Sequence, residues 1–457
     1  MLVCQLRKAA CRHTTDRKNS LVTVRAVCSN QPATTEGLIF RRGTPGSWDE
    51  AGVGSPVVRC YFGDDEERWV MWYAGRSKEA PSLDMIAPSS GSTGIAISKD
   101  GIHWVRGEGH ISGEKGASAA SDVGMVMEPN KDWWCFDTCH MQVSDVQIMS
   151  NSSVESGVGV FWMFYSGGDF QPISIPSNLP SSPDHVQPPG HKDSSHSADQ
   201  TERASPSQPV RTVEGLRMRP GLAMSQDGRN WARIEAEHHT GALFDVGSNG
   251  EWDELFIGTP QVLAVGPKDM RMFYHSWDQQ RGRYVIGLAT SPDGFRWTKK
   301  GVVFDPHPTS SGEVAGSSRS HDELGAASCH VTRDIDNRQY VMFYEAVAAD
   351  NTRSIGLAIS KDGLKDWQRC PTPLLTSSSD EVEATASGLL RWDCGSVGQP
   401  CAVSMSQGQW RLYYAGRSST GKPGANEGIG LALSVEGSAK FLGMPTQFKR
   451  RNTALSD

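Results

Sequence analysis

Five aspartates recur along the chain at equivalent points, each a few residues before an apolar segment that reads as a strand. Carboxyl groups can act as general acids and bases, because their surroundings can set their pKa values apart. If the strands that follow converge, these acids ring one common opening. The aspartates are Asp49, Asp137, Asp253, Asp322 and Asp393, and Glu50, Glu254 and Glu323 stand beside three of them.

An aspartate at such a point also has a purely structural interpretation. Its carboxylate can accept hydrogen bonds from backbone N–H groups and cap the entry to the strand. Recurrence in every unit favours this interpretation, because catalysis needs only two or three carboxylates. We predict that any chemistry uses Asp49, Asp137 and Asp253, with Glu254 as a candidate acid.

The elements that position these acids form a unit that occurs five times. The clearest motif of the unit is the turn SKDGIHW at 98–104. Similar turns lie at 225–231, 291–297 and 360–367, and a degenerate copy lies at 434–437. Asp-Gly favours a tight hairpin, since glycine accepts a positive φ. Before each turn lie a small apolar strand and a strand of alternating large and small residues. The latter strands lie at 69–75, 161–167, 270–276, 340–346 and 410–416.

Each unit therefore reads strand, strand, strand, turn, strand, and four antiparallel strands form one blade of a propeller. The sequence predicts an all-β, five-bladed β-propeller over 36–445, followed by a C-terminal tail at 446–457. WD-repeat propellers have a period of about 40–45 residues, whereas the period here is about 70. The Asp-box turn of sialidases is a minor alternative, but those boxes carry a residue between Asp and Gly.

Three motifs together resemble a known family. W-D-x-x-G-x-x-S-P-x-V from Trp48, WVMWYAG at 69–75 and the I-G-L-A-x-S-x-D-G pattern are similar to the five-bladed propellers of glycoside hydrolase families 32, 43, 62 and 68, which include arabinanases, levansucrases and invertases. The resemblance covers roughly 36–445. It implies a carbohydrate substrate at one end of the channel, and cleavage or transfer of a glycosidic bond by carboxylates from different blades. No cofactor or metal motif is visible.

The chain departs from this family at one position. In arabinanase-like members, the base is an aspartate directly before a proline at the start of the first strand of a blade. The residues before the corresponding prolines here are Ser55, Thr259 and Gln399. We expect His140 and His330 at the comparable points of the second and fourth units. The alternative function is therefore a catalytically inactive propeller that binds a glycan or a protein partner.

Side chains at the ends of the second strands are predicted to reach the same opening. Arg76 and Arg417 follow matching Ala-Gly pairs in the first and fifth units, which closure of the ring makes neighbours. Arginine can bind hydroxyl, carboxylate or phosphate groups. The predicted substrate-binding residues are Arg76, His140, His275, Asp322, His330, Glu345, Asp393 and Arg417.

Composition limits the remaining possibilities. The net charge of −7 argues against a nucleic-acid partner, and no apolar run approaches the roughly 20 residues that span a bilayer. The ten cysteines form no CxxC pair and indicate reduced thiols rather than a disulfide framework. We expect a monomer.

Two segments are predicted to lie outside the folded blades. Residues 1–30 are basic, poor in acids and contain Ser and Thr, which is typical of an organellar transit peptide. Chloroplast is the expected location, with mitochondrion or cytoplasm as alternatives, and the segment can also be read as a tail without an address. The insertion at about 171–213 is rich in Ser, Pro, His and Asp and is predicted to be a disordered loop.

Overall fold

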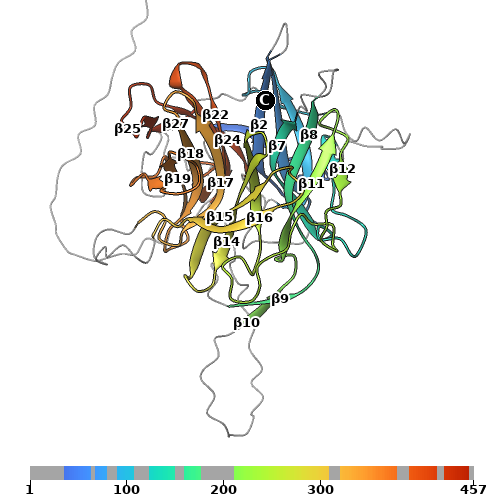
Figure 1. Cartoon of the computed structure of the whole chain (residues 1–457). Helices are drawn as coiled ribbons and strands as arrows, with labels where there is room; N and C mark the ends of the chain where they lie inside the picture. The colour runs from blue at the N-terminus through green and yellow to red at the C-terminus, as the bar shows by residue number, and fades with distance from the viewer. Residues whose placement is uncertain are drawn as a thin grey trace, which may run out of the picture.

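The computed structural model of the chain describes residues 35–62, 67–79, 90–107, 123–149, 159–176, 210–307, 320–377, 391–418 and 427–451. Within these ranges the chain forms five antiparallel sheets of four or five strands arranged in a ring (Figure 1). This confirms the predicted five-bladed β-propeller. The predicted transit peptide at 1–30 lies outside the described residues.

The blades follow one another along the chain. The first contains β2 (Gly52–Phe62), β3 (Glu67–Arg76), β4 (Ser92–Ser98) and β5 (Val105–Arg106), and β6 (Met125–Met127) also pairs with β4. The second contains β7 (His140–Met149), β8 (Val160–Gly168), β11 (Met218–Ser225) and β12 (Ala232–Ile234). The third contains β13 (Gly258–Gly266), β14 (Asp269–Asp278), β15 (Arg283–Ser291) and β16 (Thr298–Phe304).

The last two blades carry small additions. The fourth contains β17 (Ala326–Asp334), β18 (Gln339–Val347), β19 (Arg353–Ser360) and β20 (Gln368–Arg369), with β21 (Leu375–Thr376) beside β19. The fifth contains β22 (Ser396–Ser404), β23 (Trp410–Arg417) and β24 (Gly428–Ser434), joined by β1 (Leu38–Arg41) and β27 (Phe448–Arg450). A short hairpin of β25 (Lys440–Phe441) and β26 (Met444–Pro445) precedes β27. The predicted C-terminal tail thus begins with a strand of the fifth blade.

The first strands of the blades, β2, β7, β13, β17 and β22, contact one another around the ring and surround the central channel. Because all five run in the same sense, the channel has two chemically different ends. We call the end where these strands begin the N-terminal mouth and the end where they finish the C-terminal mouth.

The ring is closed by a strand from the start of the chain. β1 pairs with β24, so the fifth blade combines residues from both ends of the sequence. Leu38, Ile39 and Phe40 of β1 are all buried. Closure therefore depends on contacts that form only when the whole repeat array is complete.

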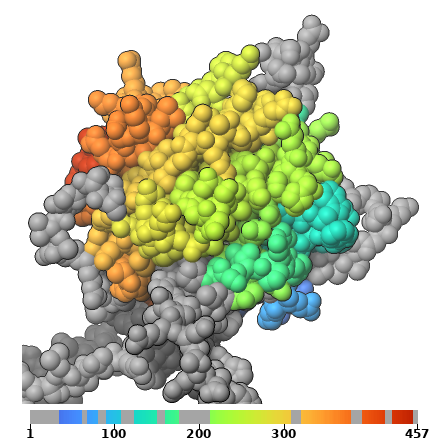
Figure 2. All heavy atoms as spheres, turned by 60° about the horizontal axis from the view of Figure 1, so that its bottom comes forward, coloured from blue at the N-terminus to red at the C-terminus, as the bar shows by residue number. Residues whose placement is uncertain are grey.

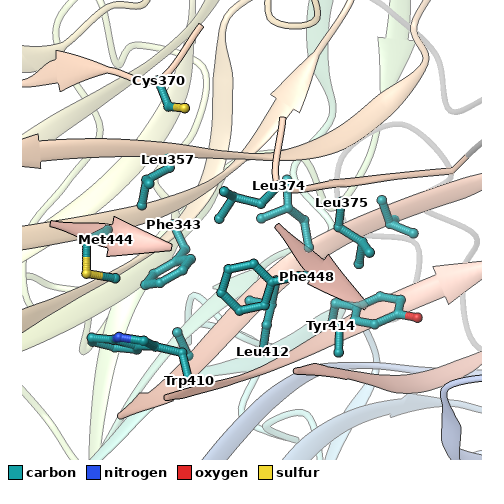
Figure 3. Close-up of a cluster of buried hydrophobic side chains, with 14 of the residues drawn as sticks. Phe343, Leu357, Cys370, Leu374, Leu375, Trp410, Leu412, Tyr414, Met444 and Phe448 are labelled. Carbon is teal, nitrogen blue, oxygen red and sulfur yellow. The ribbon is translucent and has the colours of Figure 1, made fainter. Parts of the chain in front are cut away.

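The core lies between neighbouring blades. Between the fourth and fifth blades, Phe343 and Leu357 pack with Trp410, Leu412 and Phe448 (Figure 3). Equivalent clusters fill the other gaps between blades. The alternating large residues of the second strands pack on both faces, which explains why each blade needs two neighbours.

The Asp-Gly turns dock each blade on the next. Asp227 accepts hydrogen bonds of 2.8 Å from the backbone N–H groups of Arg229 and Asn230. Trp72 of the first blade donates a 2.9 Å bond to the carbonyl of Gly228 in this turn. The turn aspartates are thus occupied within the turn itself.

The insertion in the second blade is ordered at its two ends. β9 (Ile173–Pro176) pairs with β10 (Val210–Val213), so predicted disorder does not hold there, while 177–209 lie outside the described residues. Ile175 is buried in a cluster with Trp277, Tyr284 and Val347 of the third and fourth blades. The hairpin lies at the bottom of Figure 1. It therefore packs across part of the N-terminal mouth.

Two further observations concern the described residues alone. Every cysteine among them is a free thiol. None of their helices is long and apolar enough to cross a membrane.

Candidate functional site at the N-terminal mouth

The five recurring aspartates occupy one repeated buried arrangement. Asp49 accepts a 3.1 Å hydrogen bond from the hydroxyl of Tyr73 and a 2.9 Å bond from Nε of Arg106, and it is fully buried. A tyrosine of the second strand and a cation of the outer strand contact the aspartate in every blade. The other sets are Asp137 with Tyr165 and Arg233, Asp253 with Tyr274 and Lys299, Asp322 with Tyr344 and Arg369, and Asp393 with Tyr414 and Arg450.

These contacts favour a structural role for the aspartates. Each one ties the loop before a blade to the second and outer strands of that blade, and each is neutralised by its own cation. The tyrosine and cation contacts replace much of the backbone capping expected from the sequence. Among the described residues, no two of the five share a hydrogen bond or ion pair. Glu254 lies apart from them, bonded to the N–H of Gly250 and to Gln279.

Three of the first strands carry a bulge at the residue before their proline. The register of β2, β13 and β22 shifts there, and Ser55, Thr259 and Gln399 adopt φ values of 45°, 44° and 49°. Positive φ at a non-glycine residue costs of the order of 1–3 kcal/mol and is often found at functional sites. The bulge turns these three residues out of the regular strand pattern at the N-terminal mouth.

The two predicted histidines do not lie at this level. His330 pairs with Phe343 and Val57 pairs with Trp72, and both partners precede the tyrosine that binds the repeated aspartate. His330 therefore lies level with Val57, deeper in the channel, and Ser328 is the equivalent of Ser55. This corrects the expectation for His330.

His140 lies further out than expected. It pairs with Gly168 at the first position of β7, at the outer rim of the N-terminal mouth. Its Nε2 donates a 2.8 Å hydrogen bond to the carbonyl of Gly215, and its Nδ1 contacts the hydroxyl of Ser90. Burial lowers the pKa of His140 to about 4, so the ring is neutral near pH 7.

A polar network links four blades at the level of the bulge. The N–H of Ser55 donates a 2.8 Å bond to Oε1 of Gln399, and Gln142 contacts the Ser55 hydroxyl. The N–H of Gln399 donates a 2.9 Å bond to Oε2 of Glu345, which also accepts a 3.1 Å bond from Ser328. The network converges on Glu345.

Glu345 is a buried anion at this mouth. Its Oε1 forms an ion pair with Arg353, and only 5% of the residue is exposed. Burial raises the pKa of Glu345, but the Arg353 guanidinium and the Gln399 N–H outweigh burial and hold it below its ordinary value. Nearby, Nδ1 of His275 lies 2.9 Å from the Thr259 hydroxyl.

His275 is uncharged at neutral pH. Burial lowers its pKa to about 4, although the Glu345 carboxylate opposes this. A neutral imidazole can both donate and accept a hydrogen bond. Two predicted binding residues, His275 and Glu345, are thus brought into the same buried region.

Glu427 was missed by sequence reasoning. It directly precedes β24, is 8% exposed, and its Oε1 lies 3.9 Å from Nε of Arg417. Its Oε2 makes no hydrogen bond to any described residue. A methyl group on Gly52, the pairing partner of Arg76, would overlap Oε2. Glu427 therefore lies where the fifth blade meets the first, beside both predicted arginine positions.

Glu427 and Arg353 share one position in the repeat, three residues before the glycine of a Gly-Leu-Ala strand, at Gly430 and Gly356. The equivalent points of the other blades hold no charged residue, so the repeat does not mark this position as part of a site. Only ring closure places Glu427 against the first blade.

The lower side of the molecule carries residues of several blades. Figure 2 turns the bottom of Figure 1 toward the viewer, and residues of the second to fourth blades form a continuous surface there, from green to orange. Among the described residues, no group of three or more His, Cys, Asp or Glu side chains is placed to hold a metal ion. The site is therefore an arrangement of carboxylates, arginines, neutral histidines and hydroxyls.

No protein-family model and no curated protein matches the sequence. Solved structures do match. A thermostable family-43 glycoside hydrolase is 14% identical, with a TM-score of 0.49 over 85% of this chain and 94% of its own. A glycosyl hydrolase from Bacteroides ovatus is 14% identical, with a TM-score of 0.46 over 89% and 87%.

The described sheets form a five-bladed β-propeller. A third similar structure is an N-acetylgalactosamine deacetylase from F. plautii in complex with blood group B trisaccharide. It is 13% identical, with a TM-score of 0.47 over 87% of this chain and 93% of its own. All three TM-scores are below 0.5, so the chemistry of this chain has to be argued from the side chains of its own site.

Proposed function

We propose that this propeller binds a carbohydrate at the N-terminal mouth and cleaves a glycosidic bond there, using Glu345 and Glu427. One observation carries the proposal: two glutamates from adjacent blades reach this mouth in contrasting environments. Both oxygens of Glu345 accept hydrogen bonds, from Arg353, Ser328 and the N–H of Gln399. Glu427 also has a cation near it, with Oε1 3.9 Å from Arg417, but its buried Oε2 bonds to no described residue. Contrasting environments are what separate an acid from a base.

The two carboxyl groups have different roles. Glu427 takes the position of the general acid, beside the glycosidic oxygen of the leaving group. Anionic Glu345 either attacks the sugar carbon or takes a proton from the attacking water. The serine, threonine and glutamine before the inner-strand prolines take no part in proton transfer. Ser55 and Gln399 belong to the network that orients Glu345, whereas Thr259 contacts His275.

The same mouth offers groups that bind sugar hydroxyls. Hydroxyls need both donors and acceptors. Arg76 and Arg417 supply donors, and neutral His275 and the Thr259 hydroxyl supply either. The sugar thus binds through groups that stay in one charge state near pH 7.

The test is a hydrolysis screen of the full chain on aryl glycosides and oligosaccharides of different linkage. Glu345→Gln and Glu427→Gln are expected to lower kcat by about 100-fold or more, with unchanged circular dichroism. Glu436→Gln, at an exposed position of the turn after β24, is the matched control and should keep full activity. If both Glu345→Gln and Glu427→Gln keep wild-type turnover, the assignment of these two glutamates as catalytic residues is wrong.

The aspartates are tested in the same screen. Loss of turnover in a folded Asp49→Asn, Asp137→Asn or Asp253→Asn variant would place the chemistry on them instead. Their buried tyrosine and arginine contacts lead us to expect a loss of stability rather than a specific loss of kcat.

A second candidate is sugar binding without cleavage. It is favoured by the saturation of Glu345, whose oxygens already bond to Arg353, Ser328 and the N–H of Gln399. This candidate predicts no turnover of any glycoside by the wild-type chain. It also predicts sugar binding, measured by calorimetry, that Glu345→Gln weakens.

A further inference from the structure

The channel has a second pocket at its C-terminal mouth. This pocket has a volume of about 530 Å³, a size typical of small-molecule sites. All five first strands contribute to its wall near their ends. The contributing residues include Arg59, Gln147, Leu263, His330 and Ala402. The pocket thus lies on the channel axis, at the end opposite Glu345.

The buried charges of this pocket are balanced. Arg59 pairs with Asp145, which is 1% exposed and also accepts a 3.0 Å bond from Gln147. Arg59 further donates to the carbonyls of Val146 and Val58, each at 3.0 Å. Because Asp145 neutralises the guanidinium, the pocket offers no net positive charge to an anion.

His330 presents an unused donor to the pocket. It is 7% exposed, and its Nδ1 lies 3.4 Å from the N–H of Ala402, which makes Nδ1 the acceptor. The ring proton is then on Nε2, which bonds to no described residue. Burial, aided by Arg59, lowers the pKa of His330 to about 3, so the ring stays neutral. Nε2 is not one of the buried unsatisfied atoms, and His330 lies in the pocket wall, so a ligand or water in the pocket can accept this proton.

An acceptor lies in the same wall. The amide nitrogen of Gln147 donates to Asp145 and to the carbonyl of Val262, so its Oε1 remains for a ligand. Val58, Leu263 and Val331 supply apolar surface. One donor, one acceptor and an apolar wall suit hydroxyl groups on a carbon skeleton.

We propose that the C-terminal mouth binds a neutral, hydroxyl-bearing small molecule, such as a monosaccharide or polyol, through Nε2 of His330 and Oε1 of Gln147. This site is separate from the N-terminal mouth and does not rest on catalysis there. A metal cation is disfavoured by Arg59, and an anion is disfavoured by Asp145 and by Glu67 in the wall.

Cys60 gives a readout that is local to this pocket. Its thiol is only partly buried and lies in the pocket wall, whereas the other described cysteines are buried. Burial raises the pKa of Cys60, so alkylation is measured at mildly alkaline pH. Peptide mass spectrometry of the full chain follows the alkylation rate of Cys60 with and without neutral sugars, polyols and inorganic phosphate.

A bound monosaccharide or polyol is expected to slow Cys60 alkylation about tenfold at saturation. In His330→Leu, the ligand concentration that gives half of this protection should rise about tenfold. Ser404→Trp places a large ring at the exposed rim and should slow alkylation without any ligand. Because Ser404 is exposed, this variant tests the pocket even if His330→Leu fails to fold. Glu345→Gln, at the other mouth, should leave protection unchanged.

Two results overturn the proposal. The first is that no neutral sugar or polyol changes the Cys60 rate while phosphate does. The second is that protection persists unchanged in both His330→Leu and Ser404→Trp. A failed hydrolysis screen with intact Cys60 protection would count against the proposed function alone.

Discussion

The hydroxyl of Tyr344 donates a 2.8 Å hydrogen bond to Oδ2 of Asp322, deep in the fourth blade. Arg369 and His307 contact the same carboxylate. Burial raises the pKa of Asp322, but these donors outweigh it and hold the pKa well below its usual range. The same contact between tyrosine and aspartate recurs in all five blades, so we interpret it as an interaction that stabilises the fold.

Removing this contact should lower the free energy of unfolding. Tyr344→Phe is expected to lower the free energy of unfolding by about 1–2 kcal/mol. Asp322→Ala leaves Arg369 without its anion and should cost about 3–5 kcal/mol. Urea denaturation measures both, with the exposed Asp336→Asn as control. A stable Asp322→Ala protein that has lost turnover would instead show that this aspartate serves the reaction.

The buried histidines should make stability depend on pH. The pKa is lowered to about 4 in His140 and His275 and to about 3 in His330, against about 6.5 in the unfolded chain. The unfolded chain therefore takes up protons first as the pH falls. The stabilisation is complete above about pH 6.5 and is lost as the pH falls toward 4.

Each of these histidines should contribute a slope of up to about 1.4 kcal/mol per pH unit in that window. Urea denaturation between about pH 7 and pH 5 measures the slope. His275→Gln should reduce it, whereas His239→Gln, at an exposed position, should not. A flat profile would mean that the three rings are not neutral and buried in the native protein.

Because β1 closes the ring, we expect N-terminal deletions to be tolerated up to β1 and to destabilise the protein once they remove it. Deleting residues 1–41 removes the buried Leu38, Ile39 and Phe40 and leaves β24 with an unpaired edge. Thermal unfolding should show a large loss of stability or no cooperative transition. Deleting residues 1–33 is the control and should leave the transition in place. Equal stability of the two proteins would show that β1 does not close the ring.

Gly398 should be intolerant of a side chain. A methyl group there would overlap the carboxylate of Glu345, which has no room to move because Arg353 and Ser328 hold it. Gly398→Ala is expected to weaken sugar binding and to cost about 1–3 kcal/mol. Gly266→Ala meets no atom within 4 Å and is the matched control. Calorimetry and urea denaturation read out the two effects.

The basic N-terminal segment is predicted to be a chloroplast targeting signal. Residues 1–30 fused to a fluorescent protein should direct it to the chloroplast in plant or algal cells. Replacing Arg7, Lys8 and Arg12 with glutamine should abolish import. Diffuse cytoplasmic fluorescence from the unmodified fusion would leave the segment without an organellar role.

The amino-acid sequence by itself determined the blades. Asp-Gly turns, small apolar strands and alternating second strands are local patterns, and their recurrence sets the number of blades without any knowledge of contacts. It also placed His275, Glu345, Arg76 and Arg417 near one opening, because each stands at a fixed point of the repeat. It could not show what the recurring aspartates bind, since Tyr344 and Arg369 reach Asp322 from 22 and 47 residues away.

Tertiary structure alone decided the site. Glu427 lies against Gly52 only because β1 and β24 join the two ends of the chain, and no local pattern encodes that contact. His330 stands eight residues after Asp322, as Val57 does after Asp49, so the spacing already places it beyond the level of Ser55. Only the assembled strands show that it lines the pocket at the other mouth. Position along a repeat is a one-dimensional property, whereas depth in the channel depends on pairing between strands.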